Sequence, residues 1–260
     1  MGIVSKMSSS LTRMLAVFDA FSAEHSILTA DDIMARLGYS RGTAYRYVRE
    51  LVAGGFLTRV AGSAYTLGPR IIELDYAIRQ GDPVLNAGVP VMQALRKKFQ
   101  CDVLLASFYN DRVVVTHHER GDNGITVSFG RGRAMPVYKG APSKAILSAL
   151  PPARQKKIYT EFKPAIAAAA MGSSWEEFRS KLAVIKKQGY CISLGELDPG
   201  NVGVGVPLSP DPASAGGSLS LVISRASYDI LDKALLVDVL TAAARQLENL
   251  TQQASHATVA

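Results

Sequence analysis

The sequence has few cysteines, few aromatic residues and no long hydrophobic run. Its two cysteines, Cys101 and Cys191, are far apart in the chain, which excludes a disulfide framework and a Cys-rich metal site and favours a reducing cytoplasm. No stretch without a charged residue is longer than 13 residues, whereas a membrane span needs about 20 apolar residues. With 48% hydrophobic and 20% charged residues in 260, the chain is predicted to be globular, with one large or two modest domains.

Acidic residues are scarce in one window of the chain. The formal net charge is +7, and residues 36–70 contain six arginines against a single acid, Glu50. Residues 1–35 have the opposite balance, with more acidic than basic side chains. Because arginine pairs well with phosphates and with guanine edges, this cluster predicts a surface that binds nucleic acid.

The N-terminal sequence predicts three helices and a β-hairpin, at residues 11–23, 30–37 and 41–53 and at residues 56–60 and 64–67. Ser10, Thr29 and Ser40 are expected to cap the three helices. Asp32 completes a near-capping box with Thr29, and Gly38 ends the second helix.

The third predicted helix has two different faces. Its aliphatic residues share one side, and Gly42, Tyr45, Arg46 and Arg49 share the other at helical spacing. Two helices, a polar-faced third helix and a β-ribbon, in that order, are typical of a winged helix-turn-helix, which places the third helix in the major groove. Any single arginine is better explained as part of the solvent face of an ordinary helical bundle. The arrangement as a whole favours DNA binding. The predicted DNA-contacting residues are Ser40, Arg41, Gly42, Thr43, Tyr45, Arg46, Arg49 and Arg59.

The rest of the chain predicts a linker and an α+β domain. A helix over residues 70–80 stops at Gly81-Asp82-Pro83, so we divide the chain into residues 1–69, 70–82 and 83–260. The last part predicts helices at 83–99, 143–150, 152–162 and 174–188, a basic loop at 130–139 and one long terminal helix at 229–253. Strands are expected at 102–109 and 112–119 around an Asn110-Asp111 turn, and at 124–129, 190–193, 202–207 and 218–224. Strands in hairpin order indicate an antiparallel sheet.

Several motifs, in this order and spacing, resemble those of IclR-type bacterial transcriptional regulators. They are Arg13-Met-Leu-Ala-Val-Phe, Thr43-Ala-Tyr-Arg-Tyr-Val-Arg-Glu-Leu, Gly55-Phe-Leu, Tyr65-Thr-Leu-Gly, the loop and helix that begin at Gly130-Arg-Gly-Arg, and Gly189-Tyr-Cys-Ile-Ser-Leu-Gly-Glu-Leu-Asp-Pro-Gly. No single motif is decisive, but together they cover residues 11–250.

The resemblance implies a winged-helix domain, a linker helix and a GAF-like effector domain. It also implies homodimers that pair into tetramers and bind double-stranded operator DNA in response to a small metabolite. Because no apolar segment is long enough to span a membrane, no membrane partner is predicted. The effector pocket would be formed by Met135, Ala141, Pro142, Ser143, Ser193, Gly203 and Ser220. We expect its ligand to be an anionic or neutral organic metabolite.

The chain departs from the family pattern at four of these positions. The family usually has Ser at the position of Gly42, and Gly before the lysine that matches Lys144, where this chain has Ser143. Family positions that often hold an acid or a thiol hold Ser193 and Gly203 here. A phosphate contact and the ligand specificity are therefore expected to differ.

Two other functions stay open: an enzyme that acts on a metabolite in the C-terminal pocket, and a DNA binder without a ligand. No catalytic residue, cofactor or metal site is predicted. Ser143 and Lys144 are adjacent on a predicted helix and point in different directions, so they do not form a nucleophile–base pair. His117 and His118 are expected to face opposite sides of a strand, one inward and one outward, and cannot chelate one metal together. His117 and Glu119 share one face of the predicted strand, so a metal site at these two residues stays open.

Overall fold

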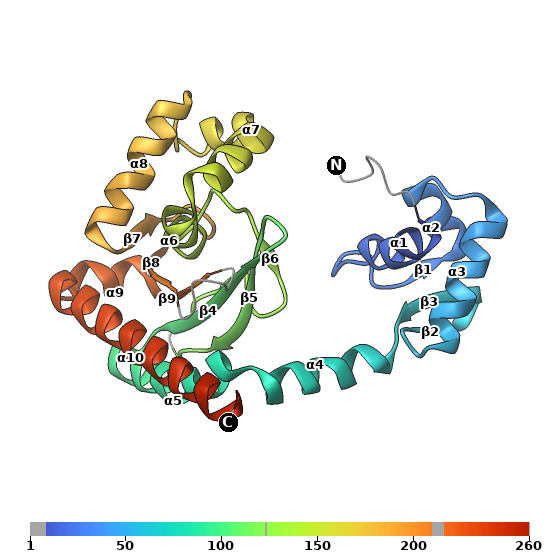
Figure 1. The fold of residues 1–260 in the computed structure, drawn as a ribbon, viewed down its shortest axis with the longest axis horizontal. Helices are drawn as coiled ribbons and strands as arrows, with labels where there is room; N and C mark the ends of the chain where they lie inside the picture. The colour runs from blue at the N-terminus through green and yellow to red at the C-terminus, as the bar shows by residue number, and fades with distance from the viewer. Residues whose placement is uncertain (1–8, 123, 210–215, 260) are drawn as a thin grey trace. The chain divides into compact units, whose positions relative to one another are not determined.

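The computed structural model describes residues 9–122, 124–209 and 216–259, and for 254–259 the backbone alone. The chain divides into two compact units, Met1–Gly81 and Asp82–Ala260, whose elements are labelled in Figure 1. Part of the predicted first domain, residues 1–8, lies outside the described residues.

The first unit is a winged helix-turn-helix, as predicted. Its elements are α1 (Ser10–Leu15), the 3-10 helix η1 (Ala16–Ala20), β1 (Leu28–Thr29), α2 (Ala30–Leu37), α3 (Arg41–Ala53), β2 (Leu57–Val60), η2 (Ala61–Ser63), β3 (Ala64–Leu67) and α4 (Pro69–Gly81). The three strands form an antiparallel sheet in the order β1-β3-β2. The hairpin β2–β3 follows α3 directly and forms the wing.

The predicted capping residues fix both ends of α2. Thr29 Oγ1 accepts a hydrogen bond from Asp32 N at 3.1 Å, and Asp32 Oδ2 accepts one from Thr29 N at 2.8 Å. The Thr29 hydroxyl also donates to Asp32 Oδ2 at 2.6 Å, and this bond, followed by that of Thr29 N, stabilises the carboxylate and holds the pKa of Asp32 below its usual 3.8. Gly38 ends the helix in the left-handed region, at φ 67°.

The start of the chain differs from the expectation. The predicted helix over residues 11–23 is a short α1 followed by the 3-10 helix η1, whose Val17 and Ala20 are buried in the core. Ser9, and not Ser10, caps α1 by accepting from Thr12 N at 3.1 Å. The Ser10 hydroxyl instead hydrogen-bonds the Tyr47 hydroxyl at 3.0 Å and ties α1 to α3.

The core of the first unit lies under α3. The buried residues of this helix are Ala44, Tyr47, Val48 and Leu51, which pack around fully buried Ile33 of α2. Tyr47 was not among the predicted apolar positions, since its polar hydroxyl hides its role in the core. The opposite face of α3 is left in solvent.

The second unit is an antiparallel sheet covered by helices on both faces (Figure 1). Its elements are α5 (Pro83–Phe99), β4 (Asp102–Tyr109), β5 (Arg112–Glu119), β6 (Ala134–Met135), α6 (Ala141–Ala149), α7 (Pro152–Ala168), α8 (Trp175–Gln188), β7 (Cys191–Leu194), β8 (Asn201–Leu208), β9 (Gly217–Ser224), α9 (Arg225–Ile230) and α10 (Lys233–Val259). The strand order is β6-β5-β4-β9-β8-β7. Helices α5 and α10 pack on one face, and α6, α7 and α8 on the other. The α+β class with an antiparallel sheet is therefore confirmed.

Residue alternation along β8 sets how closely a helix can lie on the sheet. Val202, Val204 and Val206 face the core under α5 and α10. The residues between them, Gly203 and Gly205, face α6 and have no side chain. The first turn of α6 can therefore come close to the strand.

Two predicted elements are wrong. Residues 124–129 are not a strand, because their backbone bonds side chains that are distant in sequence: Ser128 N donates to Asp198 at 3.0 Å, and Asn201 Nδ2, at the start of β8, donates to Thr126 O at 2.8 Å. The terminal helix is broken into α9 and α10, since Leu231 is extended and Asp232 Oδ1 accepts from the amides of Ala234 and Leu235, starting a new helix.

The histidine prediction is half right. His117 and His118 do face opposite sides of β5, but both are buried, with side chains 9% and 6% exposed, because helices cover both faces of the sheet. His117 Nε2 pairs with Glu119 at 2.6 Å, and His118 Nε2 with buried Asp102 at 2.7 Å. The described residues include no group of three or more His, Cys, Asp and Glu side chains placed to hold a metal ion.

Candidate DNA-binding surface and ligand pocket

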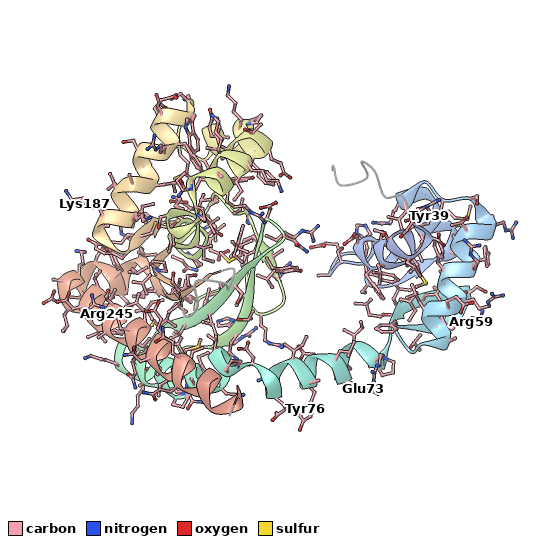
Figure 2. All side chains as sticks on the ribbon, viewed as in Figure 1. Tyr39, Arg59, Glu73, Tyr76, Lys187 and Arg245 are labelled. Atoms are coloured by element: carbon pink, nitrogen blue, oxygen red, sulfur yellow. The ribbon has the colours of Figure 1, made fainter. Side chains whose placement is uncertain are left out.

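An open, basic groove runs between the solvent face of α3 and the wing. It is lined by Gly42, Tyr45, Arg46, Val48, Arg49, Val52, Arg59 and Tyr65. Arg46 and Arg49 come from α3, whereas Arg59 comes from β2 (Figure 2). All three guanidinium side chains are exposed, so the groove presents positive charge from two elements.

Arginines of the first unit lie over tyrosine rings. The guanidinium carbon of Arg46 is 5.3 Å from the centre of the Tyr47 ring, and that of Arg59 is 5.8 Å from the centre of Tyr65. Two further pairs are similar: Arg41 with Tyr45 at 5.5 Å and Arg13 with Tyr39 at 4.7 Å. Such cation–π contacts hold an arginine in place; Arg59 also donates from Nη2 to the Tyr65 hydroxyl at 3.5 Å. A guanidinium has five N–H donors, so others are left for a phosphate or a base edge.

The N-terminus of α3 is open to an anion. Ser40 precedes the helix, but its side chain makes no capping bond to the backbone and donates instead to Thr43 Oγ1 at 3.0 Å. At Gly42, an added Cβ would meet nothing within 4 Å, so packing within the unit does not require glycine there. A DNA backbone can approach the helix at this point, where the first-turn amides point outward.

Arg49 forms an exposed ion pair on the solvent face of α3. Its Nη2 pairs with Glu50 Oε1 at 3.0 Å, and both side chains are more than half exposed. An exposed pair of this kind contributes little to stability. Arg49 can therefore exchange Glu50 for a phosphate at small cost.

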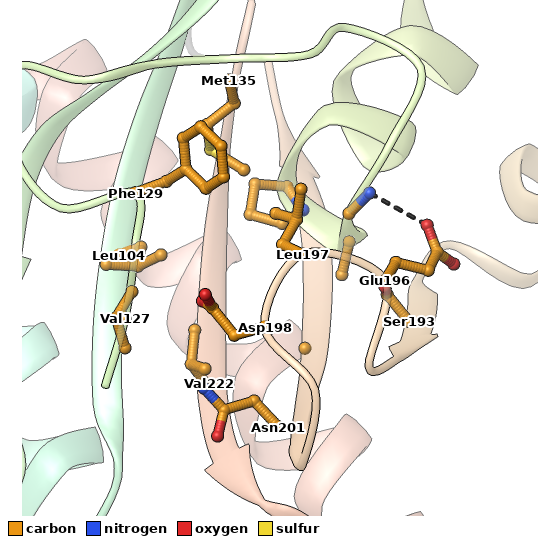
Figure 3. A pocket seen from close by; sticks show the side chains of 14 residues that line it. Leu104, Val127, Phe129, Met135, Ser193, Glu196, Leu197, Asp198, Asn201 and Val222 are labelled. Atoms are coloured by element: carbon orange, nitrogen blue, oxygen red, sulfur yellow. Dashed lines mark hydrogen bonds between the residues drawn. The ribbon is translucent and has the colours of Figure 1, made fainter. Parts of the chain in front are cut away.

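The second unit contains a half-open pocket between the first turn of α6 and the sheet (Figure 3). The cavity itself is small, about 40 Å³, and the empty space that includes its opening to solvent is about 410 Å³. The lining consists of Leu104, Val127, Phe129, Met135, Gly140, Ala141, Pro142, Ser193, Glu196, Leu197, Asp198, Asn201, Gly203 and Val222. Four of these residues have polar side chains, and the rest form an apolar wall, as in a site for a small organic molecule.

Glu196 is bound to the beginning of α6. Its Oε2 accepts from Gly140 N at 3.0 Å, the bond drawn in Figure 3, and its Oε1 pairs with Lys144 Nζ. A carboxylate is favoured at a helix N-terminus, where backbone N–H groups and the helix dipole attract negative charge. The loop between β7 and β8 is thereby anchored over the pocket.

The same loop is tied to the irregular segment 124–129. Asp198 accepts from Ser128 N at 3.0 Å and from the Ser128 hydroxyl, and Asn201 donates to Thr126. Val127 and Phe129, which alternate with these residues, line the pocket. Two segments far apart in sequence thus close the cavity together.

Three buried serine hydroxyls near the pocket have no hydrogen-bond partner among the described residues. They belong to Ser143, Ser218 and Ser220, which are almost fully buried. None of them lines the pocket. They lie where α6 packs on the sheet, and a hydroxyl fits there because Gly205 leaves room: a Cβ at Gly205 would come within 2.8 Å of Ser220 Oγ.

Comparison with known families decides the identity. The bacterial transcriptional regulator IclR C-terminal model matches residues 79–249, more than half of the chain, and the IclR helix-turn-helix model matches residues 10–61. The chain belongs to the IclR family of bacterial transcriptional regulators.

Curated IclR-type relatives are also regulators. The HTH-type transcriptional regulator KipR of Bacillus subtilis is 22% identical, covering 81% of this chain and 84% of that protein. The Pca regulon regulatory protein of Pseudomonas putida is 22% identical, covering 92% and 82%. Since the matched families and relatives are transcriptional regulators, the chain is a regulator and not an enzyme.

Solved structures show the same fold. An IclR homolog from Microbacterium hydrocarbonoxydans, complexed with 4-hydroxybenzoate, has a TM-score of 0.76 and 22% identity, covering 95% of this chain and all of that one. An IclR family regulator from Brucella abortus has a TM-score of 0.76 and 21% identity, covering 98% and 96%. Within the described residues, no helix is both long enough and apolar enough to cross a bilayer.

The structure brings most of the predicted DNA residues together. Gly42, Tyr45, Arg46, Arg49 and Arg59 line the groove, while Ser40, Arg41 and Thr43 stand at the N-terminus of α3 beside it. Sequence reasoning missed the groove residues Val48, Val52 and Tyr65. The alternation of β3 carries a signal for Tyr65, because it pairs directly with Arg59 across the hairpin.

The predicted effector residues divide into two groups. Met135, Ala141, Pro142, Ser193 and Gly203 line the pocket. Ser143 and Ser220 do not; they are buried between α6 and the sheet.

Sequence reasoning missed much of the IclR-type pocket wall. It missed Leu104, Val127, Phe129, Gly140, Glu196, Leu197, Asp198, Asn201 and Val222. The run Gly-Glu-Leu-Asp-Pro-Gly at 195–200 held the available signal, since its turn residues enclose two acids.

Proposed function

We propose that this IclR-family regulator reads operator DNA with the groove between α3 and the wing. The observation that carries the proposal is the convergence of Arg46, Arg49 and Arg59 on one exposed groove, beside an uncapped helix N-terminus. Here α3 enters the major groove, Arg46 and Tyr45 face base edges, and Arg59 contacts the backbone at the edge. Ser40, Thr43 and the first-turn amides of α3 meet a phosphate.

The second part of the proposal concerns the ligand. The pocket under α6 binds a small metabolite, which changes the affinity for the operator. Its mostly apolar wall with a few polar groups supports this role, and a structural neighbour was solved with 4-hydroxybenzoate. Thermodynamic linkage makes the coupling reciprocal: the operator changes the affinity for the metabolite by the same factor.

The third part concerns assembly. Helix α4 buries none of its residues within the chain, and Ile72, Tyr76 and Ile78 are 72%, 66% and 65% exposed. Figure 2 shows Tyr76 projecting from this helix. We propose that α4 pairs with its copy in a homodimer, which presents two α3 helices to the half-sites of a pseudo-palindrome, and that dimers associate further. We also propose a cytoplasmic location, where the protein would meet the DNA that it regulates.

The test is selection of duplex DNA by the full chain from a random pool, followed by titration of the selected duplex at several salt concentrations. We expect a specific site whose association constant falls linearly with salt on a logarithmic scale, because phosphates release counterions on binding. Absence of any selected duplex, or binding without salt dependence, would contradict the proposal.

A further inference from the structure

Tyr47 of α3 is buried, yet its ring contacts an arginine of the DNA groove. Tyr47 follows Arg46 directly, but its side chain is turned into the core and the residue is only 3% exposed. Adjacent residues of a helix point about 100° apart, so Arg46 stands at the border between the solvent face of α3 and its buried face. The Arg46 guanidinium carbon lies 5.3 Å from the centre of the Tyr47 ring. A core residue therefore supports a side chain that lines the groove.

The Tyr47 side chain is itself fixed at two points. Its hydroxyl hydrogen-bonds the Ser10 hydroxyl at 3.0 Å. Its ring meets the ring of Tyr39 edge-on, with centres 5.8 Å apart and an angle of 82° between the planes. The hydrogen bond with Ser10 and, to a smaller extent, the Arg46 side chain hold the pKa of Tyr47 below its usual 10.0, although burial raises it. The phenol is thus held between Ser10 and Arg46.

Both of these contacts lead back to α1. Ser10 is the first residue of that helix. Tyr39 lies in the turn between α2 and α3 (Figure 2), and its hydroxyl donates to Arg13 O of α1 at 2.8 Å. The Arg13 guanidinium carbon lies 4.7 Å from the centre of the same ring. No described residue of α1 lines the groove, but contacts with α1 determine where the Tyr47 ring stands.

Resting on the proposed role of this groove in DNA binding, we propose that Tyr47 is a positioning residue for Arg46. The ring restrains the Arg46 guanidinium at the edge of the groove, and α1 holds the ring in place. A long arginine side chain is mobile in solution and ordering it is costly, so an arginine that is already placed binds a phosphate or a base edge more tightly. Tyr47 touches no DNA in this arrangement and acts only through Arg46.

Three variants of the full chain separate positioning from packing. Tyr47→Leu removes the ring but keeps an apolar side chain, whereas Tyr47→Phe keeps the ring and loses only the bond to Ser10. Phe18→Leu removes another aromatic ring of the same core, one that lies 5.9 Å from the ring of Phe56. We expect Tyr47→Leu to bind the selected duplex about fivefold more weakly at fixed salt, and Tyr47→Phe to stay within about twofold of the unaltered protein. Phe18→Leu should lower the melting temperature without changing the affinity.

A double-mutant cycle with Arg46→Ala decides how Tyr47 acts. If the ring works through Arg46, Tyr47→Leu costs about fivefold in affinity while Arg46 is present and nothing measurable once Arg46 is alanine. A second measurement needs no DNA. The NMR signal of the Arg46 Nε–H group, assigned by its loss in Arg46→Ala, should report greater mobility in Tyr47→Leu and unchanged mobility in Phe18→Leu, as nitrogen relaxation rates would show. Melting temperatures verify that each variant folds.

The outcomes distinguish this inference from the proposed function. Unchanged affinity in Tyr47→Leu, an equal loss with and without Arg46, or unchanged Arg46 mobility in Tyr47→Leu would show that Tyr47 only fills the core. The positioning role is then overturned, and the DNA surface stands as long as Arg46→Ala itself weakens binding. If Arg46→Ala leaves binding unchanged, the role of Arg46 in the proposed function fails, and the role of Tyr47 fails with it.

Discussion

Gly205 of β8 lies directly against the main chain of Ala141 in the first turn of α6. A Cβ placed on Gly205 would come within 2.9 Å of the Ala141 carbonyl oxygen and within 2.8 Å of Ser220 Oγ. Because a real Cβ does not approach backbone so closely, any side chain here must push α6 away from the sheet. The position of α6, and with it one wall of the pocket, depends on this contact.

The variant Gly205→Ala tests that dependence. We expect it to lower the free energy of unfolding by about 1–3 kcal/mol, the usual cost of overpacking a core, and to weaken ligand binding, since Ala141 lines the pocket. Urea denaturation measures the first effect. Gly81→Ala, where an added Cβ meets nothing within 4 Å, is the matched control. Equal stability of the two variants would show that α6 does not rest on Gly205.

Replacing Arg46 by alanine tests the DNA surface. We expect Arg46→Ala to weaken binding to the selected operator by about 1–3 kcal/mol if Arg46 reads a guanine, with relaxed specificity at one base position. Fluorescence anisotropy at fixed salt measures the loss. Arg245→Ala, which removes an exposed arginine of the second unit (Figure 2), should change little. Unchanged affinity and salt slope for Arg46→Ala would remove this residue from the interface.

The variant Gly42→Ala is expected to change protein stability and DNA affinity in opposite directions. Gly42→Ala should raise the free energy of unfolding by up to about 1 kcal/mol, because alanine favours a helix more than glycine and the new methyl group meets no atom of the protein. If DNA comes close to α3 here, the same variant should bind the operator more weakly. Thermal denaturation and anisotropy follow the two quantities. A more stable protein with unchanged affinity would mean that the DNA backbone keeps its distance at Gly42.

Helix α4 is expected to hold the dimer. Replacing both Ile72 and Tyr76 with glutamate places charges on its exposed apolar surface and should shift the protein to smaller assemblies, as sedimentation velocity would detect. Ile230→Glu alters an even more exposed apolar residue, 87% exposed in the second unit, and should leave the mass unchanged. A double variant that sediments like the unaltered protein would place the dimer contact elsewhere.

Both cysteines should resist thiol reagents in the folded protein. Burial raises the pKa of Cys101 to about 12 and that of Cys191 to about 11, so at pH 8 both remain protonated and covered. Because the unfolded chain loses these protons above pH 9, the usual pKa, stability should fall as the pH rises from 9 through 11 and 12. Absorbance after addition of a disulfide reagent should show no reaction until urea is added. Rapid labelling without urea would contradict the burial.

Local chemistry explains which parts of the fold could be predicted. Thr29 with Asp32 and Gly38 mark the ends of α2 through bonds within a few residues. The turn at Asn110-Asp111 marks a hairpin whose predicted strand ends agree with the structure. Such signals lie within one short segment, so a sequence can reveal them without knowledge of the tertiary fold.

The errors in the sheet and in the pocket concern partners that are distant in sequence, whereas the break between α9 and α10 has a local cause at Asp232. The segment at 124–129 alternates like a strand, yet Asp198 and Asn201, about 70 positions away, supply its hydrogen bonds. Burial of His118 depends on Asp102, which pairs with it across the sheet. For the same reason the pocket residues Glu196 and Asp198 could not be assigned: their motif was visible in the sequence, but the elements they contact were not.

The four arginine–tyrosine pairs of the first unit also affect the entropy of binding. An arginine that already lies on a tyrosine ring has fewer accessible rotamers, so its side chain loses less entropy when it binds DNA. The DNA-binding surface is thus shaped before it meets DNA, and an operator must present its base edges and phosphates where these arginines already stand.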